Sequence, residues 1–225
     1  MKTLTLVVPV YNSPDLARAV LTHLDELRTA ATANGFELVE TLFVDDGSAK
    51  PLELDVQPGV VVLRNEMNRG KGYSVRRGAL AAKGAWVLMS DVDLSAPLGE
   101  FARLASRADA WMVCGSRAGR PGMPCRRKFL SCLFHCMVAL AGVTGVKDTQ
   151  CGFKLFRMGV MRPLFEALKT ERFSFDVELI RRVLRAGGTV VEVPVAWHGG
   201  VRSSLRVSTD APRMLWDLFK ISREK

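Results

Sequence analysis

The sequence of 225 residues lacks the patterns on which several large classes of protein depend. Its five cysteines are scattered without a CxxC pair, so neither a disulfide scaffold nor a zinc ribbon is indicated, and we expect reduced thiols. No GxSxG motif occurs and the three histidines lie in unrelated contexts, which removes support for a serine hydrolase. Aromatic residues make up only 8% of the chain and the basic residues are spread out, so nucleic acid is not an expected partner.

The chain also contains little that would cross a membrane. Its first stretch, MKTLTLVVPVYN, has one lysine and a short apolar run broken by threonines and a proline, which indicates a strand and not a signal peptide. Residues 129–146 carry no formal charge and reach the ~18 residues at which a spanning helix must be considered. Polar residues and glycines weaken that interpretation. Because Arg126, Arg127 and Lys128 precede the segment, we expect a helix that lies in a headgroup layer or packs on the domain.

The composition is sufficient for one α/β domain. With 48% hydrophobic and 24% charged residues, the chain can bury a sizeable core. Its 32 lysines and arginines against 23 aspartates and glutamates give a formal net charge of +9. That charge favours an anionic partner such as nucleotide phosphates or acidic lipid headgroups, with a basic surface for solubility as the alternative. We see no internal repeat or linker, so residues 1–225 are expected to form a single domain.

Predicted strands and helices alternate along the chain. Apolar runs predict strands over residues 3–10, 37–47, 59–65, 85–93, 110–117 and 189–197. Helices are predicted from Pro14 to about Ala31 and over residues 70–84, 98–107, 159–168, 174–186 and 209–221. Nearly continuous apolar strands that alternate with helices are typical of an α/β fold. We therefore predict a mostly parallel central sheet with helices on both faces.

Polar residues lie at the ends of the predicted strands or just after them, namely Asn12, Asp45 with Asp46, and Asp91 with Asp93. In parallel sheets, ligands bind beyond the carboxyl ends of the strands, so we expect these residues to share one site. Two aspartates at the mouth of a buried strand repel each other unless a cation lies between them. In an extended segment Asp91 and Asp93 point to the same side and could bind one Mg²⁺ or Mn²⁺. A capped turn before the next helix is the alternative.

A glycine-rich stretch, GKGYSV, begins at Gly70. It is neither a Walker A loop nor a dinucleotide-binding fingerprint, because Val75 stands where the third glycine would be. Gly70 and Gly72 would still let the backbone approach a phosphate, with the cation of Lys71 beside it. On this motif alone, a solvated turn is the alternative.

Several motifs occur together in one order: VVPVYN, VDDGS, NRGKGYSVRRG, SDVDLS, GSR, DTQCGFKLF, FSFDVEL and VPVAWH. Together they resemble the inverting family-two glycosyltransferases, in particular the branch that glycosylates polyprenyl phosphates, such as dolichyl-phosphate glucose and mannose synthases. The resemblance covers nearly the whole chain, and DTQCGFKLF with FDVEL is most similar to the dolichyl-phosphate glucosyltransferases. It implies a GT-A-like fold and metal-dependent, inverting transfer of a hexose from a nucleotide sugar to a lipid phosphate.

The resemblance implies roles for individual residues on the donor side. Residues that match the nucleobase and ribose contacts of the family are Pro9, Tyr11, Asn12 and Asp45, with Asp46 in the same acidic turn. Lys71 matches the lysine that faces the diphosphate, and Asp91 with Asp93 matches the pair that binds Mg²⁺ or Mn²⁺. Asp148 falls where sugar or acceptor contacts are expected, as a candidate base or positioning residue.

The acceptor side shows one departure from the family pattern. Residues that the resemblance implies for the acceptor phosphate are Arg117, Arg127, Ser131, Ser203 and Arg202. Arg127 and Ser131 share one face of a helix by their spacing. Relatives commonly end the loop after VPVxW in Ser-Lys, whereas Ser203 is followed here by Ser204. Either Arg202 or Arg206 is therefore expected to supply the positive charge.

The resemblance leaves open the donor, the acceptor and the location. UDP-glucose is the expected donor, and GDP-mannose or another UDP-sugar is the alternative. The acceptor is a phosphate whose chain is dolichyl, undecaprenyl or non-isoprenoid. A noncatalytic nucleotide-sugar-binding protein is a further possibility. A nucleotidyltransferase is disfavoured, because PVYNSP stands where its GxGxR loop would follow the first strand. We expect a cytoplasmic protein that is peripherally associated with the inner face of a membrane, by itself or through a membrane partner protein.

Overall fold

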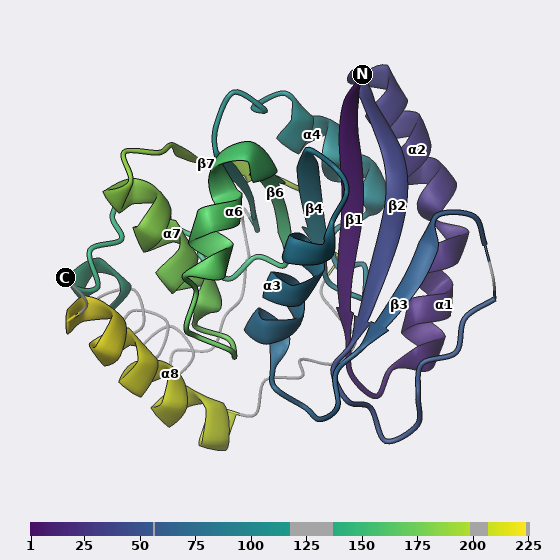
Figure 1. Ribbon diagram of the computed structural model, residues 1–225. Coiled ribbons are helices and arrows are strands. Elements are labelled where there is room, and N and C mark those ends of the chain that lie inside the picture. Colours follow the sequence, from purple (N-terminus) through teal and green to yellow (C-terminus); the bar gives the residue numbers. More distant parts are fainter. Residues whose placement is uncertain (56, 118–136, 199–206, 224–225) are drawn as a thin grey trace.

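The computed structural model describes residues 1–55, 57–117, 137–198 and 207–223 and contains a seven-stranded sheet (Figure 1). The order of the strands across the sheet is β3-β2-β1-β4-β6-β5-β7. Their bounds are β1 Lys2–Val10, β2 Phe36–Asp45, β3 Val60–Arg64, β4 Trp86–Ser90, β5 Met112–Ser116, β6 Phe153–Arg157 and β7 Val190–Pro194. The helices are α1 Pro14–Thr22, α2 Leu24–Ala33, α3 Lys71–Ala81, η1 Leu98–Glu100, α4 Phe101–Ala105, α6 Met158–Glu166, α7 Phe175–Arg185 and α8 Val207–Arg223.

The prediction of a mostly parallel sheet is confirmed, with one strand that the sequence patterns did not indicate. β1 pairs in parallel with β2 and β4, β2 with β3, and β5 with β7, whereas β6 is antiparallel to both of its neighbours. β6 was not predicted because Lys154 interrupts a short apolar run. In the structure Lys154 is fully buried and forms an ion pair with Asp176 of α7. A partner distant in sequence therefore allows this strand to lie inside the sheet.

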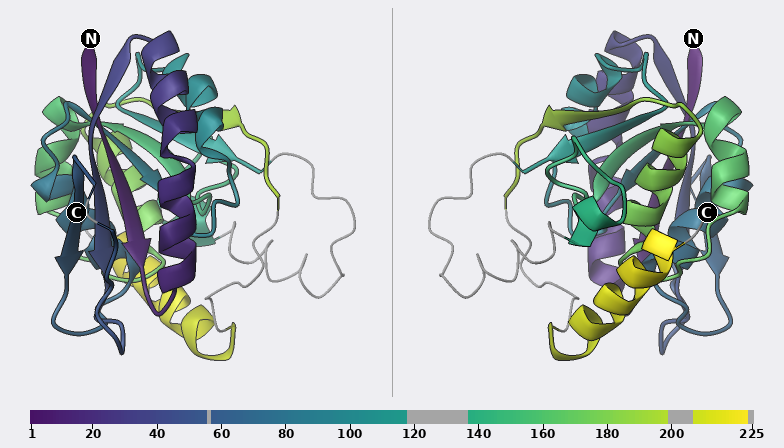
Figure 2. Two further views of the ribbon diagram at one scale, coloured as in Figure 1. Left: turned by 90° about the vertical axis from the view of Figure 1, so that its right-hand side faces the viewer. Right: turned by 90° about the vertical axis from the view of Figure 1, so that its left-hand side faces the viewer.

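Two hydrophobic cores cover the two faces of the sheet. Helices α3, α6, α7 and α8 pack on one face, whose core includes Val7, Phe156 and Phe175. Helices α1, α2 and α4 cover the other face, where Phe36 contacts Phe101 edge to face at a centroid distance of 5.2 Å (Figures 1 and 2). Successive residues of a strand point to opposite faces, so both sides of β1 are apolar and buried. Helices on both faces were predicted and are confirmed.

The single helix predicted from Pro14 to about Ala31 is wrong, because the chain forms two helices that meet at His23. The Oγ1 of Thr22 donates a hydrogen bond of 2.8 Å to the carbonyl of Ala19, and His23 Nδ1 lies 2.9 Å from the same oxygen. Side chains that bond to nearby carbonyls compete with the regular helical pattern. This local competition ends α1 one residue before His23.

The described part of the apolar segment 129–146 packs on the domain. Its helical residues end at 140, and Val138, Ala141 and Val143 are buried in the core. Gly142 has a φ of +79°, a conformation that ends the helix there. Residues 129–136 lie outside the described part of the chain. Among the residues that the structure describes, none of the helices has both the length and the apolar character that crossing a membrane requires.

The register of the central strands brings the predicted site residues to one edge. Val10 of β1 pairs with Asp45 of β2, and Val7 pairs with Met89 of β4. Asp91 therefore follows β4 at about the level of the last residues of β1. The carboxyl ends of β1, β2 and β4 meet at this edge, which is the lower edge of the sheet in Figure 1.

Two glycines in helices provide a test of the packing. A methyl group at Gly78 of α3 would lie 2.5 Å from Val7 Cγ1 and 3.1 Å from Val44 Cγ2, so we expect Gly78→Ala to lower the free energy of unfolding by ~1–3 kcal/mol. At Gly159 of α6 the same methyl group meets nothing within 4 Å, so Gly159→Ala is expected to leave stability unchanged or slightly raised. Urea unfolding of both variants measures the difference. Equal effects would contradict the close approach of α3 to the sheet.

Candidate active site

The acidic turn after β2 organises two neighbouring loops. Asp45 is fully buried and accepts hydrogen bonds from the backbone N–H groups of Ser48 at 3.0 Å and Leu52 at 3.1 Å. Ser48 donates to Oδ1 and Leu52 to Oδ2, and Arg64 Nη1 also donates to Oδ2, at 2.6 Å. Burial raises the pKa of the Asp45 carboxyl, but the hydrogen bonds and the charge of Arg64 together lower it by a larger amount. The pKa therefore lies below its ordinary value. Asp45 therefore shapes the turn as a permanent anion.

Asp46 holds the glycine-rich loop in place. Its carboxylate accepts hydrogen bonds from the backbone N–H groups of Arg69 at 3.0 Å and Gly70 at 2.8 Å. The side-chain amide of Asn65 donates to it at 2.8 Å. The two aspartates predicted for the nucleotide site thus lie at the carboxyl edge of the sheet, with their carboxylates bonded to protein groups. Direct contact with a nucleotide stays a prediction.

The loop after β1 is tied to the same turn. The side-chain oxygen of Asn12 accepts a hydrogen bond from the N–H of Ala49 at 2.9 Å, and the N–H of Asn12 donates to Ser48 Oγ at 2.9 Å. Asn12 has a φ of +50°, which asparagine tolerates better than most residues. Pro9 is the next-to-last residue of β1, and Tyr11 is half exposed beside this turn. The structure therefore brings together the residues predicted to surround the nucleoside.

The glycines of the loop are required by packing within the protein. A Cβ at Gly70, whose φ is +111°, would lie 2.7 Å from the carbonyl oxygen of Glu171. A Cβ at Gly72 would lie 2.6 Å from the Cβ of Phe175. Both contacts involve the segment before or at the start of α7. Close approach of this segment, which the sequence did not reveal, explains the glycines without a bound phosphate.

Asp91 lies where three segments meet. Its Oδ1 is 2.5 Å from Nζ of Lys71, the first residue of α3. Its backbone N–H donates to the carbonyl of Gly152 at 2.9 Å. A Cβ at Gly152 would lie 1.8 Å from Asp91 Oδ2, so only glycine fits there. Lys71 and Asp91, which the sequence analysis placed in one site, are therefore in direct contact.

The extended conformation predicted for 91–93 is wrong, because β4 ends at Ser90 and a turn follows. The N–H of Leu94 donates to the carbonyl of Asp91 at 3.2 Å, and Leu94 has a φ of +48°. Asp93 Oδ1 accepts a hydrogen bond from the N–H of Ser95 at 3.0 Å, which is the capped turn that was the alternative interpretation. Both aspartates nevertheless lie in the same turn at the edge of the sheet.

The residues of this turn fit a divalent cation that is shared with a substrate. Carboxylate oxygens are the ligands that Mg²⁺ and Mn²⁺ prefer, and the ammonium of Lys71 already sits against Asp91 where positive charge is favourable. Within the described residues no group of three or more histidine, cysteine, aspartate or glutamate side chains could hold an ion by itself. An ion at Asp91 and Asp93 would therefore need ligands from water or from substrate phosphates.

Arg117 and Asp148, both predicted near the acceptor, form an ion pair with each other. Arg117 Nε donates to Oδ2 of Asp148 at 2.6 Å, and Arg117 Nη2 donates to Oδ1 at 2.6 Å. The backbone N–H of Arg117 also donates to Oδ2, at 3.0 Å. Burial raises the pKa of the Asp148 carboxyl, but the bonds and the charge of Arg117 outweigh this, so the pKa is lowered. A carboxylate held in this way is a weak base, and the geometry favours a positioning role.

A second buried ion pair was missed by the sequence analysis. Nζ of Lys154 lies 2.7 Å from Oδ1 of Asp176, and both side chains are buried. Burial lowers the pKa of Lys154, but the charge of Asp176 raises it more, so the lysine stays charged. Phe175, the residue before Asp176, packs against Gly72, the residue after Lys71, so this pair lies close to the site. The only signal in the sequence was the presence of charged residues inside apolar motifs, Lys154 in GFKLF and Asp176 with Glu178 in FDVEL.

The remaining predicted site residues lie outside the described residues. These are Arg127, Ser131, Arg202 and Ser203.

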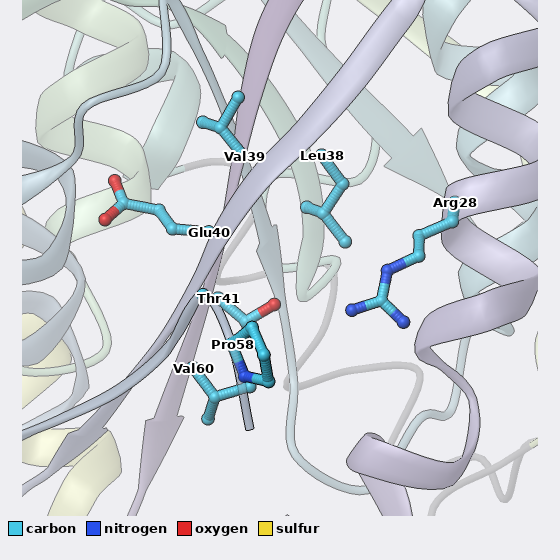
Figure 3. A pocket seen from close by; sticks show the side chains of 8 residues that line it. Arg28, Leu38, Val39, Glu40, Thr41, Pro58 and Val60 are labelled. Atoms are coloured by element: carbon cyan, nitrogen blue, oxygen red, sulfur yellow. The ribbon is translucent and has the colours of Figure 1, made fainter. Parts of the chain in front are cut away.

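A small hollow elsewhere on the molecule is not part of this site. It lies beside β2, has a volume of about 20 Å³ and has room for about one water molecule (Figure 3). It is lined by Arg28, Leu38, Val39, Glu40, Thr41, Pro58, Gly59 and Val60. The carboxylate of Glu40 points away from Arg28 in Figure 3, and it accepts hydrogen bonds from Thr5 and from the backbone of Lys83.

The sheet topology and the acidic edge define a GT-A-like α/β domain, as predicted. Residues 5–165 match the family model described as Glycosyl transferase family 2, and the chain belongs to this family. It is 34% identical to a dolichyl-phosphate beta-glucosyltransferase of Trichomonas vaginalis, over 97% of this chain and 70% of the relative. It is also 34% identical to the Drosophila melanogaster enzyme of the same name, over 97% of this chain and 74% of the relative. The resemblance inferred from the motifs is confirmed.

Solved structures show the same fold at low identity. A glucosyl-3-phosphoglycerate synthase of Mycobacterium tuberculosis, solved with Mn²⁺, UDP and glucosyl-3-phosphoglycerate, is similar with a TM-score of 0.71 at 17% identity, over 98% of this chain and 78% of that one. A mannosyl-3-phosphoglycerate synthase of Rubrobacter xylanophilus is similar with a TM-score of 0.70 at 18% identity, over 98% of this chain and 72% of that one.

The Arg117–Asp148 pair gives the site a predictable response to pH. Because the pKa of Asp148 is lowered by folding, its contribution to stability is complete above its unfolded pKa of ~3.9 and is lost as the pH falls through the folded pKa. We expect Asp148→Asn to lower the free energy of unfolding by ~3 kcal/mol at pH 7, since it leaves a largely buried arginine unpaired. Urea unfolding is measured between pH 7 and pH 3. The difference in the free energy of unfolding between the variant and wild type should become smaller below about pH 4.

The matched control is Asp109→Asn, which breaks an exposed pair with Arg107 and is expected to change stability by less than ~1 kcal/mol. A difference for Asp148→Asn that does not vary with pH would contradict the ion-pair explanation.

Proposed function

We propose that the protein transfers glucose from UDP-glucose to a polyprenyl phosphate, with inversion at the anomeric carbon. The observation that carries this proposal is the contact of Lys71 with Asp91, next to Asp93, at the carboxyl edge of the sheet. It is supported by relatives of 30–34% identity that are named dolichyl-phosphate beta-glucosyltransferases. The family defines the reaction type. The names of these relatives favour glucose over mannose as the transferred sugar, and a dolichyl-type acceptor over a non-isoprenoid one.

The donor is proposed to bind across the ends of β1, β2 and β4. Tyr11 and Asn12 would contact the nucleoside, and the turn shaped by Asp45 and Asp46 would form the other side of its pocket. Lys71 would reach the diphosphate, whose negative charge grows as the bond to glucose breaks. Since the ammonium of Lys71 already pairs with Asp91, the lysine is positioned before the donor arrives.

Asp91 and Asp93 would hold Mg²⁺ or Mn²⁺ together with the donor diphosphate. When bound, the ion would supply positive charge to the leaving diphosphate. Asp91 is suited to this role because its backbone is fixed by Gly152 and its side chain by Lys71. The need for substrate oxygens in the ion's coordination would couple metal binding to donor binding.

The acceptor phosphate is proposed to act as the nucleophile without a protein base. A phosphate monoester has a second pKa of ~6 and is mostly a dianion at neutral pH. One of its oxygens attacks the anomeric carbon while the bond from that carbon to the diphosphate breaks, and a single in-line displacement inverts the centre. Asp148, which is ionised and bonded to Arg117, would position the arginine. Residues proposed to bind the acceptor phosphate are Arg117, Arg127, Ser131, Arg202 and Ser203.

We propose that the protein meets this lipid as a peripheral protein on the cytoplasmic face of a membrane. A membrane partner protein stays a prediction, because neither the names of the relatives nor the described residues indicate one.

The direct test is a product assay with purified protein. UDP-glucose, GDP-mannose and two other UDP-sugars are each incubated with a short polyprenyl phosphate, with Mg²⁺, Mn²⁺ or EDTA, and products are identified by mass spectrometry. We expect a glucosyl polyprenyl phosphate that requires a divalent cation. Faster transfer from GDP-mannose would contradict the donor assignment. Binding of UDP-glucose in calorimetry without any product would indicate a noncatalytic nucleotide-sugar binder.

The acidic pair can be tested separately from the fold. We expect Asp91→Asn and Asp93→Asn each to lower kcat by ~100-fold or more, because charge stabilisation of the leaving group is lost. The far-ultraviolet circular dichroism should not change. Asp15→Asn, at a residue whose side chain is 94% exposed in α1, is the matched control and should retain full activity. Turnover near the wild-type level in either site variant, unaffected by EDTA, would disprove the metal role.

A further inference from the structure

Helix α8 has one face that packs on the domain. Met214, Leu218 and Ile221 are buried, at a spacing of four and three residues that places them on one side of the helix. Leu218 and Ile221 belong to the hydrophobic core shared with α6 and α7. This face is sufficient to hold α8 against α7, as in other amphipathic surface helices.

The opposite side of α8 exposes two aromatic rings. Trp216 is 58% exposed and Phe219 is 41% exposed, and their rings stack at a centroid distance of 5.7 Å. Neither belongs to the buried cores. Large apolar rings gathered in water are unfavourable and commonly mark a surface that binds something. The packing of α8 does not explain them.

Cations surround the two rings. Nζ of Lys220 lies 5.5 Å from the Trp216 ring, and the guanidinium of Arg223 lies 4.5 Å from the Phe219 ring. Arg213, one turn before Trp216, is also exposed. Asp217 is the sole acidic residue between positions 213 and 223, and it is half buried beside Ser174 at the start of α7. The exposed face therefore carries aromatic rings and positive charge, while the acid lies to one side.

We propose that this face, formed by Arg213, Trp216, Phe219, Lys220 and Arg223, docks on an anionic lipid bilayer. The rings would enter the boundary between headgroups and acyl chains, and the cations would pair with lipid phosphates. The inference rests on the proposed function in one respect, since it names the surface that meets the membrane in which the acceptor lies.

Charge decides between a bilayer and a second copy of the chain. Pairing this face with itself would bring the cations of both copies together, in a protein whose formal net charge is already +9. An anionic bilayer neutralises those cations, and each Lys or Arg near such a surface adds to binding. The composition of the face therefore favours lipid.

The position of α8 suits a lipid acceptor. Figures 1 and 2 show α8 along the lower side of the molecule, the side toward which β1 runs. α8 packs against α7, and Phe175 at the start of α7 lies against Gly72, the residue after Lys71. A bilayer on α8 would thus lie beside the candidate active site.

Vesicle binding tests the proposal with the full chain. Co-sedimentation is measured with two kinds of vesicle, phosphatidylcholine alone and phosphatidylcholine with roughly 30 mol% phosphatidylglycerol. The second kind carries the negative surface charge that attracts basic segments. We expect wild type to bind the anionic vesicles more tightly, and less so at high salt. Trp216→Ser with Phe219→Ser should weaken binding by ~10-fold or more, and Lys220→Gln with Arg223→Gln by ~25-fold on anionic vesicles only.

The matched control is Leu16→Ser with Val61→Ser, which removes two apolar side chains of 41% and 40% exposure on α1 and β3. It should bind vesicles like wild type. Vesicle binding that is undetectable in wild type, or unchanged in the aromatic variant, would overturn the proposal. So would a wild-type dimer in sedimentation velocity that the aromatic variant abolishes, because the face would then join two copies.

A transfer assay separates this inference from the proposed function. With a short polyprenyl phosphate in detergent, the aromatic variant should keep the wild-type rate, whereas with acceptor in vesicles it should be slowed by the same factor as its binding. Loss of rate in both assays would overturn a purely docking role. Absence of transfer by wild type in every assay, with vesicle binding and its loss as expected, would contradict the proposed function and leave the docking surface supported.

Discussion

The ion pair between Lys71 and Asp91 is the contact on which the candidate site depends. Lys71 begins α3 and Asp91 follows β4, so the pair joins the glycine-rich loop to the centre of the sheet. It can form only because Gly152 leaves space for the Asp91 carboxylate and Gly72 lets α3 approach the start of α7. The ion pair thus requires close packing of segments that are far apart in the sequence, and any side chain at either glycine would disturb it.

Most charges near this edge are paired with protein groups. Asp45 bonds with Arg64, Asp148 with Arg117, and Lys154 with Asp176, while Asp46 binds backbone N–H groups. Buried charges need such partners, because an unpaired ion in the interior is costly. None of these four carboxylates is free to act as a general base, because each is bonded to a cation or to N–H groups of the protein. The arrangement suits a reaction in which positioned charges stabilise a leaving group and the nucleophile arrives already ionised.

Much of this fold followed from local patterns, and the errors have identifiable causes. The apolar runs of β1, β2 and β4 and the aspartates after them were predicted at nearly the observed positions. The break at His23 was missed because side-chain bonds to Ala19 compete with the helix. β6 was missed because a lysine is expected at the surface, and the sequence does not show that Asp176 pairs with Lys154 inside the protein. The turn after Ser90 was read as an extension of the strand, since hydrophobic periodicity carries little information about where a strand ends.

The sequence by itself determined the alternation of strands and helices, the family, and the edge at which the acidic residues gather, because these depend on periodicity and on short motifs. Only the tertiary structure decided that Asp148 pairs with Arg117, that Lys154 pairs with Asp176, and that the glycines at 70, 72 and 152 serve close packing. It also decided which side of α8 is buried and which exposes its aromatic rings. These features arise from contacts between distant segments, whose free energy no local pattern records.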